Sequence, residues 1–268
     1  MRVELIIATY QKPDYLRLAL SAVAQQVVMP ERICVADDGS DARTKAVLEE
    51  FAGLPIRHVR HEDLGFRKTR ILNEAVQSSG AEYLIFIDDD CVMHPGFVQR
   101  YVQRARADQF ATGSVIRLEA AETQGLLAAG RVRWDKGRLP GWRAKGMSDW
   151  LKAMGPPAPV GRLLDRVSPI RRSWAGGNAG TFRDNILKVN GFDETMAYGG
   201  EDKEFGIRLA NAGIKGVTLR YSAPLYHLDH PRGYVDPVVQ CRNREMIAAA
   251  RDGGKVWTEN GLVPGPKP

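Results

Sequence analysis

Cysteine is scarce in this chain, and its spacing excludes two common ways of stabilising a small domain. Cys34, Cys91 and Cys241 lie far apart, and an odd number cannot form a fully paired disulfide framework. No C-x-x-C pair occurs, so the sequence gives no indication of a structural zinc site. We expect reduced thiols that pack as small hydrophobic side chains.

Long apolar runs are absent as well. No run approaches the roughly 18–20 residues that span a bilayer. The opening MRVELIIATY is too short an apolar stretch for a secretory signal and predicts a first β-strand instead. A hydrophobic content of 44% in 268 residues is nevertheless enough for a sizeable core. We therefore expect a cytoplasmic protein.

Positive charge is unevenly distributed. The net charge is +6, yet residues 131–172 alone hold eleven Lys and Arg against three Asp, a net +8, which leaves −2 for the rest. A local basic segment favours phosphate, anionic lipid or nucleic acid as a neighbour and does not choose among them.

The first 118 residues alternate between short β-branched runs and longer helical stretches. Strands are expected at residues 3–10, 32–38, 56–61, 82–90 and 110–118, and helices at 13–27, 41–51, 67–77 and 95–107. Repeated βαβ units of this kind predict an α/β fold with a mixed, mostly parallel central sheet flanked by helices.

Regularity is lost from residue 119 to 172, where Gly, Pro, Trp and basic residues leave only brief helical runs. Long irregular segments inside a compact domain are usually functional loops or mobile segments. Order returns with helices expected at 184–190, 201–212 and 237–251 and a strand at 216–222, and the tail from 256 to 268 is expected to be disordered.

Three consecutive carboxylates, Asp88, Asp89 and Asp90, follow the apolar strand YLIFI. Ligands of open α/β sheets bind beyond the carboxyl ends of the strands. Asp88 and Asp90 would point the same way in an extended segment, where their oxygens could hold Mg²⁺ or Mn²⁺ and, through it, a diphosphate. The alternative is a solvated acidic turn that caps the next helix.

Two further acidic motifs stand at the ends of predicted elements. ADDGS (36–40) could bind a base or ribose, or could be an Asp-Gly turn that caps a helix. In GGED (199–202), the glycines permit close backbone approach to a ligand, and one carboxylate could deprotonate a hydroxyl. The alternative for GGED is an acidic helix start that complements the macrodipole.

Two histidines, His227 and His230, lie three residues apart just after a predicted strand. One imidazole could complete a mixed Asp/His site, which favours Mn²⁺ somewhat over Mg²⁺. A pair of hydrogen-bonded surface histidines is the alternative, and we interpret His94 as structural. Because all these clusters fall where one cleft could collect them, their combination favours a functional site.

Four of these motifs together, ATYQK, ADDGS, IDDD and GGED, resemble family 2 glycosyltransferases of the GT-A (Rossmann-like) fold. GGNAGTFRDNILKVNGFDETMAYGGEDKEFGIRL is similar to the β4-galactosyltransferase-like region of bacterial chondroitin-polymerase-type enzymes. HEDLGFRKTRILNEA resembles the donor-side loop and helix of that group. The resemblance covers about residues 1–118 and 173–230.

The resemblance implies one GT-A domain over residues 1–255. A nucleotide-sugar half (1–118) and an acceptor and metal half (173–255) flank the irregular basic insertion (119–172).

The resemblance also implies a role for particular residues. The donor would be bound by Thr9, Tyr10, Asp38, Arg67, Arg70, Asn73, Asp88 and Asp89, with Asp37 less favoured than Asp38 for the base. The metal, Mn²⁺ or Mg²⁺, would be held by Asp90 and His227 with help from Asp88, and His230 is the alternative histidine. Asp202 would be the catalytic base with Glu201 beside it, and the acceptor would meet Trp174, Gly176, Gly177 and Asn178, with Trp174 stacking on a sugar ring.

The activity implied is metal-dependent, inverting transfer of a hexose or N-acetylhexosamine from a UDP-sugar to a glycan hydroxyl in surface polysaccharide or lipopolysaccharide assembly. We expect the basic segment 131–172 to form a mobile flap over a lipid-linked or phosphorylated acceptor at the inner face of an anionic membrane. A solvated loop is the alternative for that segment.

Alternatives for the whole chain are a nucleotidyltransferase that makes nucleotide sugars, or a non-catalytic protein that binds sugar or nucleic acid. A nucleic-acid partner is not expected, because no recognised module is visible.

Overall fold

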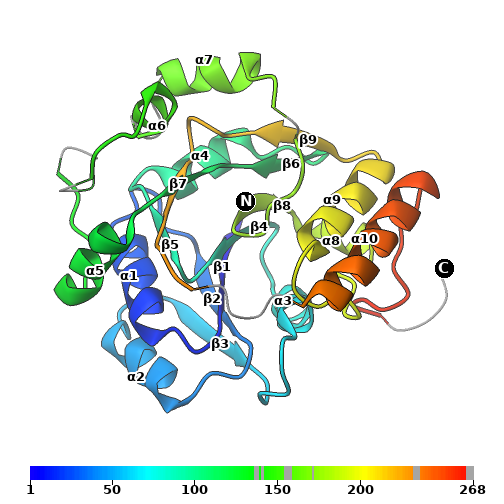
Figure 1. The fold of residues 1–268 in the computed structure, drawn as a ribbon, viewed down its shortest axis with the longest axis horizontal. Helices are drawn as coiled ribbons and strands as arrows, with labels where there is room; N and C mark the ends of the chain where they lie inside the picture. The colour runs from blue at the N-terminus through cyan, green and yellow to red at the C-terminus, as the bar shows by residue number, and fades with distance from the viewer. Residues whose placement is uncertain (136–138, 140–141, 154–158, 171, 232–235, 264–268) are drawn as a thin grey trace.

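A seven-stranded mixed sheet forms the centre of the computed structural model, which describes residues 1–135, 139, 142–153, 159–170, 172–231 and 236–263. Its strand order is β3-β2-β1-β4-β8-β6-β9 (Figure 1). The strands are β1 (Val3–Thr9), β2 (Arg32–Asp37), β3 (Ile56–Arg60), β4 (Tyr83–Asp88), β6 (Gln109–Thr112), β8 (Asn178–Phe182) and β9 (Lys215–Thr218). Only β8 runs antiparallel to its neighbours in this sheet. The predicted α/β fold with a mostly parallel sheet is confirmed.

A small second sheet has the order β5-β10-β7. Its strands are β5 (Cys91–Met93), β7 (Val115–Arg117) and β10 (Leu225–His227), with β10 antiparallel to β5 and parallel to β7. It places His227 opposite Cys91, next to the acidic end of β4.

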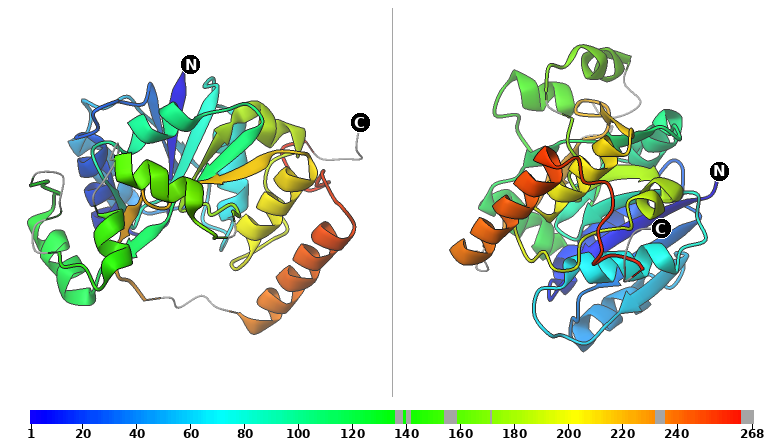
Figure 2. Two further views of the ribbon diagram at one scale, coloured as in Figure 1. Left: turned by 90° about the horizontal axis from the view of Figure 1, so that it is seen from above. Right: turned by 90° about the vertical axis from the view of Figure 1, so that its right-hand side faces the viewer.

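Helices cover both faces of the large sheet, as the two turned views show (Figure 2). They are α1 (Pro13–Val23), α2 (Ala42–Glu50), α3 (Lys68–Gln77), α4 (Phe97–Arg104), α5 (Ala120–Ala129), α6 (Met147–Lys152), α7 (Pro159–Val167), α8 (Arg183–Lys188), α9 (Glu201–Asn211) and α10 (Pro237–Asp252). In the described part of the chain, no helix is both long and apolar enough to cross a bilayer.

The continuous apolar run of β1 is explained by its two covered faces. Leu5 and Ile7 belong to the core on the α1 side, whereas Ile6 and Ala8 belong to the core on the α3 side. A strand buried on both faces shows no polar alternation. The sheet therefore divides the interior into two apolar layers, and the strand ends remain for polar residues.

Two expectations for the middle of the chain differ from the structure. The strand expected at 110–118 is two strands in different sheets, and they separate at Gly113, where the side-chain amide of Asn178 occupies the space a Cβ would need. The segment 119–172 carries three helices, α5, α6 and α7, while residues 136–138, 140–141, 154–158 and 171 lie outside the described residues.

The tail expected to be disordered from residue 256 is packed as far as Val263, and 264–268 lie outside the described residues. The Asn190 side chain bonds both the N–H and the C=O of Val263, each at 2.9 Å. Thr258 is buried, and its hydroxyl donates to Asp193 at 2.5 Å. Composition suggests disorder here, but a turn far away in sequence supplies the missing hydrogen-bond partners.

Trp174 is a core residue, which corrects its predicted role as a platform for an acceptor sugar. Its side chain is 2% exposed and is surrounded edge-on by four rings, Phe86, Phe110, Phe192 and Phe205. Both faces of the indole are enclosed by this cluster, so no face is open to a ligand.

Replacing Trp174 by Ala therefore tests packing. We expect the free energy of unfolding, measured by urea denaturation, to fall by about 3–5 kcal/mol because a large buried ring is lost. The matched control is Trp150→Ala on α6, whose side chain is 47% exposed, and it should change stability by about 0.5 kcal/mol or less. Equal stability of the wild type and Trp174→Ala would contradict this assignment.

Candidate active site

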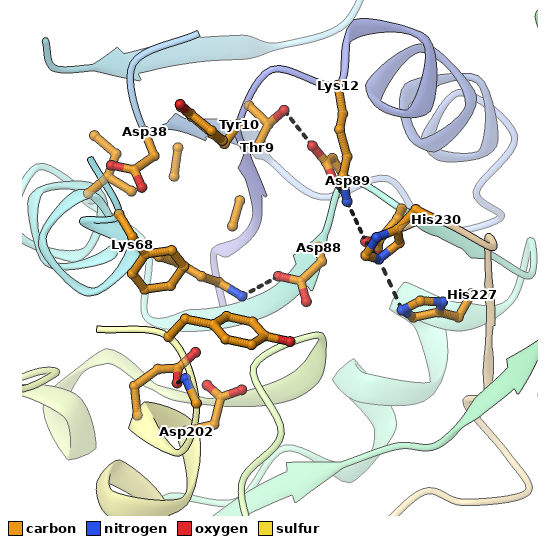
Figure 3. Close-up of a pocket in the computed structure, with 18 of the residues that line it drawn as sticks. Thr9, Tyr10, Lys12, Asp38, Lys68, Asp88, Asp89, Asp202, His227 and His230 are labelled. Carbon is orange, nitrogen blue, oxygen red and sulfur yellow. Dashed lines mark hydrogen bonds and ion pairs between the residues drawn. The ribbon is translucent and has the colours of Figure 1, made fainter. Parts of the chain in front are cut away.

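A cavity of about 550 Å³ opens at the carboxyl ends of β1, β2 and β4 (Figure 3). It collects side chains from both halves of the sequence. Its polar lining includes Thr9, Tyr10, Lys12, Asp38, Lys68, residues 88–90, residues 198–202, His227 and His230. Two acidic motifs, GGED and the end of β4, thus meet one Asp of ADDGS and both histidines in a single pocket.

The three carboxylates that end β4 diverge. Asp88 lies 2.5 Å from the ammonium of Lys68, and Asp89 accepts a hydrogen bond of 2.7 Å from the Thr9 hydroxyl. Asp90 lies 3.0 Å from the ammonium of Lys12. Because β4 ends at Asp88 and the chain turns at 89–90, the alternation of an extended strand does not continue. Asp88 is therefore paired with Lys68 and lies outside the group that Asp90 forms with the two histidines, so the geometry does not support its predicted metal role.

Asp90 instead forms a compact group with both histidines. Its carboxylate lies 2.9 Å from Nε2 of His230 and 3.7 Å from Nε2 of His227. One ligand atom from each of the three residues lies within 4.8 Å of the others. One carboxylate oxygen and two imidazole nitrogens at this spacing fit a divalent ion such as Mn²⁺.

The charge states of Asp90 and His227 suit ligation, whereas His230 must release a proton before its Nε2 can bind an ion. Although burial opposes it, the hydrogen bond from His230 and the charge of Lys12 hold the pKa of Asp90 below its usual range. The hydrogen bond to Asp90 raises the pKa of His230, whereas burial lowers the pKa of His227. His227 is therefore neutral at pH 7 with a lone pair to offer, and His230 lies closer to the carboxylate.

On the donor side, Asp38 rather than Asp37 lines the pocket. Asp38 is bound by Nε2 of His61 at 2.6 Å and by the backbone N–H of Arg67 at 2.9 Å. Asp37 is turned away and is held by His58 and by the N–H of Ser40. Burial raises the pKa of Asp38. The side chain that the motif favours for base recognition is thus fixed at the pocket wall.

Aromatic rings close this side of the pocket. Phe66 and Tyr198 meet edge to face with centroids 5.8 Å apart. Tyr10 is 46% exposed, and its hydroxyl donates to Asp63 at 3.1 Å. Rings placed around a polar cavity offer flat surfaces to a base or a sugar.

Three predicted donor residues do not line the cavity with their side chains. Arg67 contributes its backbone N–H, and Arg70 pairs with Glu74 on the surface of α3. Asn73 is buried, where its amide bonds the backbone N–H and C=O of Phe192. For Arg70 and Asn73 the face of α3 decides the outcome, because the side chains that face the pocket on this helix are Lys68 and Ile71, whereas Arg67 is the N-cap that precedes the helix.

The GGED motif brings Asp202 to the pocket at the start of α9. Gly199 and Gly200 have φ values of +109° and +113°, which side chains rarely permit, and the turned-back carboxylate of Glu201 accepts the N–H of Gly199 at 2.9 Å. Oδ1 of Asp202 is buried and has no hydrogen-bond partner among the described residues. Burial and the charge of Glu201 raise the pKa of Asp202 to about 7, against the charge of Lys68.

The glycines predicted to line the acceptor side lie beneath the carboxylates instead. A Cβ on Gly176 would stand 2.4 Å from Oδ1 of Asp202, and one on Gly177 would stand 2.8 Å from Asp88. Asn178 is 2% exposed and bonds Tyr101, Ser114 and Ala223. Gly176, Gly177 and Asn178 do not line the cavity, and the two glycines leave room for its carboxylates, so their predicted contact with the acceptor stays a prediction.

Sequence matches agree with this geometry. A family model described as glycosyl transferase family 2 matches residues 4–149, which is more than half of the chain. The chain belongs to glycosyl transferase family 2. A model described as the N-terminal domain of galactosyltransferase matches residues 166–231.

Curated relatives of this family 2 glycosyltransferase include polysaccharide synthases. Chondroitin synthase of Escherichia coli is 24% identical over 255 residues, 85% of this chain and 35% of the relative. Hyaluronan synthase of Pasteurella multocida is 26% identical over 241 residues, which cover 83% of this chain and 24% of the relative. Validoxylamine A glucosyltransferase of Streptomyces hygroscopicus subsp. limoneus is 26% identical over 242 residues, which cover 82% of this chain and 50% of the relative. The chain spans half or less of the length of these relatives.

Solved structures confirm the GT-A fold of the family 2 enzyme. S. aureus TarS 1–349 in complex with UDP-GlcNAc has a TM-score of 0.63 at 15% identity, covering 93% of this chain and 66% of that one. The mannosyltransferase PcManGT from Pyrobaculum calidifontis in complex with GDP-Man and Mn²⁺ has a TM-score of 0.58 at 15% identity, covering 94% and 71%.

Two lysines of the enzyme's pocket, Lys12 and Lys68, were missed by sequence reasoning. Lys68 lies between carboxylates of both motifs, and although burial opposes it, the charges of Asp88, Asp202 and Glu201 hold its pKa well above the usual value. Lys12 stands just before α1 and reaches Asp90. The available signal was a lone basic residue close to a strand end or at a helix start, which is too common to be specific.

Lys12 competes with a divalent ion for Asp90. We expect Lys12→Met to bind Mn²⁺, without nucleotide, about tenfold more tightly, equivalent to about 1.4 kcal/mol, because an ammonium at 3.0 Å is removed. Free Mn²⁺ would be measured by electron paramagnetic resonance. Lys45→Met on the exposed side of α2 removes the same charge elsewhere and should leave the affinity unchanged. Equal affinity in all three proteins would exclude the competition.

Proposed function

We propose that this chain transfers a hexose or N-acetylhexosamine from a UDP-sugar to a hydroxyl of an acceptor glycan, with inversion and with a divalent metal. One observation carries the proposal. The buried carboxylate of Asp202, with an oxygen that has no partner among the described residues, faces the same cavity as His227 and His230 (Figure 3), which form a group with Asp90. A base and a site for a leaving diphosphate are what a single displacement requires.

The chain's own residues can then be given roles. A metal held by Asp90, His227 and His230 would supply positive charge against the departing diphosphate. Asp202 accepts the proton of the acceptor hydroxyl. As the hydroxyl oxygen bonds to the anomeric carbon, the bond from that carbon to the diphosphate oxygen breaks. Attack from the face opposite the leaving group inverts the configuration, so a UDP-α-sugar gives a β-linkage. Asp38 and the rings of Tyr10 and Phe66 bind the nucleotide.

The UDP donor is supported by the relatives. TarS is similar in fold and was solved with UDP and with UDP-GlcNAc. The chondroitin and hyaluronan synthases point to a glycan acceptor and polysaccharide assembly. The mannosyltransferase with GDP-Man and Mn²⁺ has the same fold and supports the metal, while its nucleotide leaves GDP as the competing donor class.

A donor-hydrolysis panel tests the proposed function. The protein is incubated with UDP-, GDP- and dTDP-sugars in Mn²⁺, Mg²⁺ or EDTA, and released nucleotide is measured. We expect UDP release from one donor with Mn²⁺, its loss in EDTA and its loss in Asp90→Ala. UDP release that is unaffected by EDTA and by Asp90→Ala would contradict the metal role. If no donor reacts and UDP with Mn²⁺ also leaves the melting temperature unchanged, the proposal fails.

The base role of Asp202 gives a second prediction. Asp202→Asn should lower kcat by about 10²–10⁴-fold, the usual contribution of a positioned base, while UDP affinity is retained. Because the base must be ionised, kcat/KM of the wild type should rise with pH and level off above the Asp202 pKa of about 7.

Lys68 provides the control for that assignment, since its charge lowers the pKa of Asp202. Lys68→Met should therefore move the midpoint of the pH profile upward. A midpoint that stays in place, or an Asp202→Asn enzyme with the wild-type profile, would show that another group is the base.

A peripheral contact of the 131–172 segment with an anionic membrane is also proposed. Its described part exposes apolar side chains on α6 and α7, Met147, Trp150, Val160, Leu163 and Val167, beside Arg162 and Arg166. Exposed apolar residues and arginines occur together on α7, and this combination on a short helix suits an interfacial position. We expect binding to phosphatidylglycerol vesicles and none to phosphatidylcholine vesicles, and equal binding to both would contradict the charge dependence.

A further inference from the structure

A second cavity, of about 490 Å³, lies between α4, α7 and β9, three elements that gather in one region of the molecule (Figures 1 and 2). It shares no lining residue with the active-site pocket. Six of its ten lining residues are arginines, which come from α4 and the loop after it, from α7, and from the segment before β8: Arg100, Arg104, Arg106, Arg162, Arg166 and Arg172. Asp165 is the one acidic residue among the described residues of this lining.

Asp165 offsets only part of this positive charge, because one carboxylate faces six guanidinium groups and its oxygens are mainly engaged with neutral donors. It accepts the backbone N–H of Tyr221 at 2.8 Å and the hydroxyl of Ser222. The nearest guanidinium nitrogen, on Arg100, is 3.9 Å away. These bonds fasten α7 to the loop after β9, and Gly161 lets the helix approach the carbonyl of Tyr221, which a Cβ would meet at 2.8 Å. The cavity wall is therefore built and held in place.

Arg100 shows the unbalanced charge most clearly. Its side chain is 7% exposed, and its Nε donates to the Ser222 hydroxyl at 2.8 Å. Burial and, to a smaller extent, the charges of Arg162, Arg104 and Arg166 together lower the pKa of Arg100 to about 10, against the attraction of Asp165. The buried guanidinium of Arg100 is thus surrounded by other positive charges, and an anion bound in the cavity would stabilise all of them.

Arg162 presents a buried donor that no described residue accepts from. Its Nη2 donates to Gln103 at 3.3 Å, whereas its Nε is buried and meets no acceptor among the residues that the structure describes. A buried donor without a partner is costly, about 1–3 kcal/mol. An acceptor oxygen supplied by a ligand would remove that cost.

We propose that this cavity binds a phosphate group, carried as a monoester or a diester. The guanidinium fork matches phosphate oxygens with paired hydrogen bonds, and Arg is preferred over Lys for this geometry. The volume lies within the range of about 300–1,000 Å³ typical of small-molecule sites. The binding of phosphate here does not depend on the proposed glycosyl transfer, since the two cavities have separate linings.

The test is calorimetric titration with inorganic phosphate in EDTA, with chloride used to keep the ionic strength constant. We expect saturable binding by the wild type and at least tenfold weaker binding by Arg104→Gln/Arg166→Gln, in which neither residue belongs to the proposed active site. The matched control is Arg43→Gln/Arg251→Gln, which removes two exposed charges that pair with Asp41 and Asp252. It should bind phosphate like the wild type.

Equal weakening in both double variants, or no saturable binding by the wild type, would overturn the proposal. A mapping experiment on the wild type keeps the test independent of variant folding. Phenylglyoxal modification of arginines is followed by mass spectrometry with and without phosphate. Protection of Arg104 and Arg166 but not of Arg251 supports the site, and equal labelling with and without phosphate overturns it.

The source of the phosphate is decided by two further arms with the same proteins. The group is a lipid headgroup if three results are obtained with phosphatidylglycerol vesicles: the wild type binds them, the Arg104→Gln/Arg166→Gln variant does not, and inorganic phosphate displaces the wild type from them. If inorganic phosphate binds but the vesicles bind the wild type and this variant equally, the group is soluble or glycan-borne. Either result supports the cavity and leaves the donor-hydrolysis panel unaffected, so failure here and failure of the transferase proposal are distinguishable.

Discussion

Six carboxylates line one cavity at the carboxyl edge of the sheet, and their mutual repulsion is the constraint that organises the surrounding structure. Buried like charges are costly unless each meets a cation or a hydrogen-bond donor. Lys68 lies beside Asp88, Thr9 donates to Asp89, and Lys12 and His230 lie beside Asp90. The negative charge that these partners do not balance shows at Asp89. Burial and the charge of Asp90 raise the pKa of Asp89 to about 7, a sign that the pocket as built has room for more positive charge.

Backbone geometry lets these carboxylates approach one another. β8 inserts antiparallel between β4 and β6, and its register sets Asn178 opposite Ile87, next to Asp88. The turn before β8 then passes beneath Asp88 and Asp202, where any residue larger than Gly176 or Gly177 would collide with them. One antiparallel strand thereby joins the strand end from the first half of the chain to the α9 carboxylate from the second.

Positive charge is concentrated in the second cavity, between α4, α7 and β9. The arginine-lined cavity and the carboxylate-lined cavity are each far from neutral, although the whole chain carries only +6. A family 2 glycosyltransferase must hold a negatively charged nucleotide donor, and the carboxylate cavity can do so only through cations. The arginine cavity needs no such mediator. The two cavities therefore differ in the groups that could hold an anion: Lys12, Lys68 and the proposed metal in one case, and guanidinium groups in the other.

Local sequence by itself determined the βαβ alternation, the strand ends that carry Asp38 and Asp90, and the helix start that carries Asp202. These follow from hydrophobic period and from the position of polar residues relative to an element, which need no knowledge of distant contacts. Only the tertiary structure decided which neighbours each side chain meets. Asn73 belongs to a recognisable motif and Trp174 stands two residues before one, yet both face the core, because a motif fixes a position along the chain and not the direction of each side chain. The packed tail at 256–263, the divergence of Asp88 from Asp90, and the ammonium groups of Lys12 and Lys68 likewise depend on partners far away in sequence, and no local pattern encodes those.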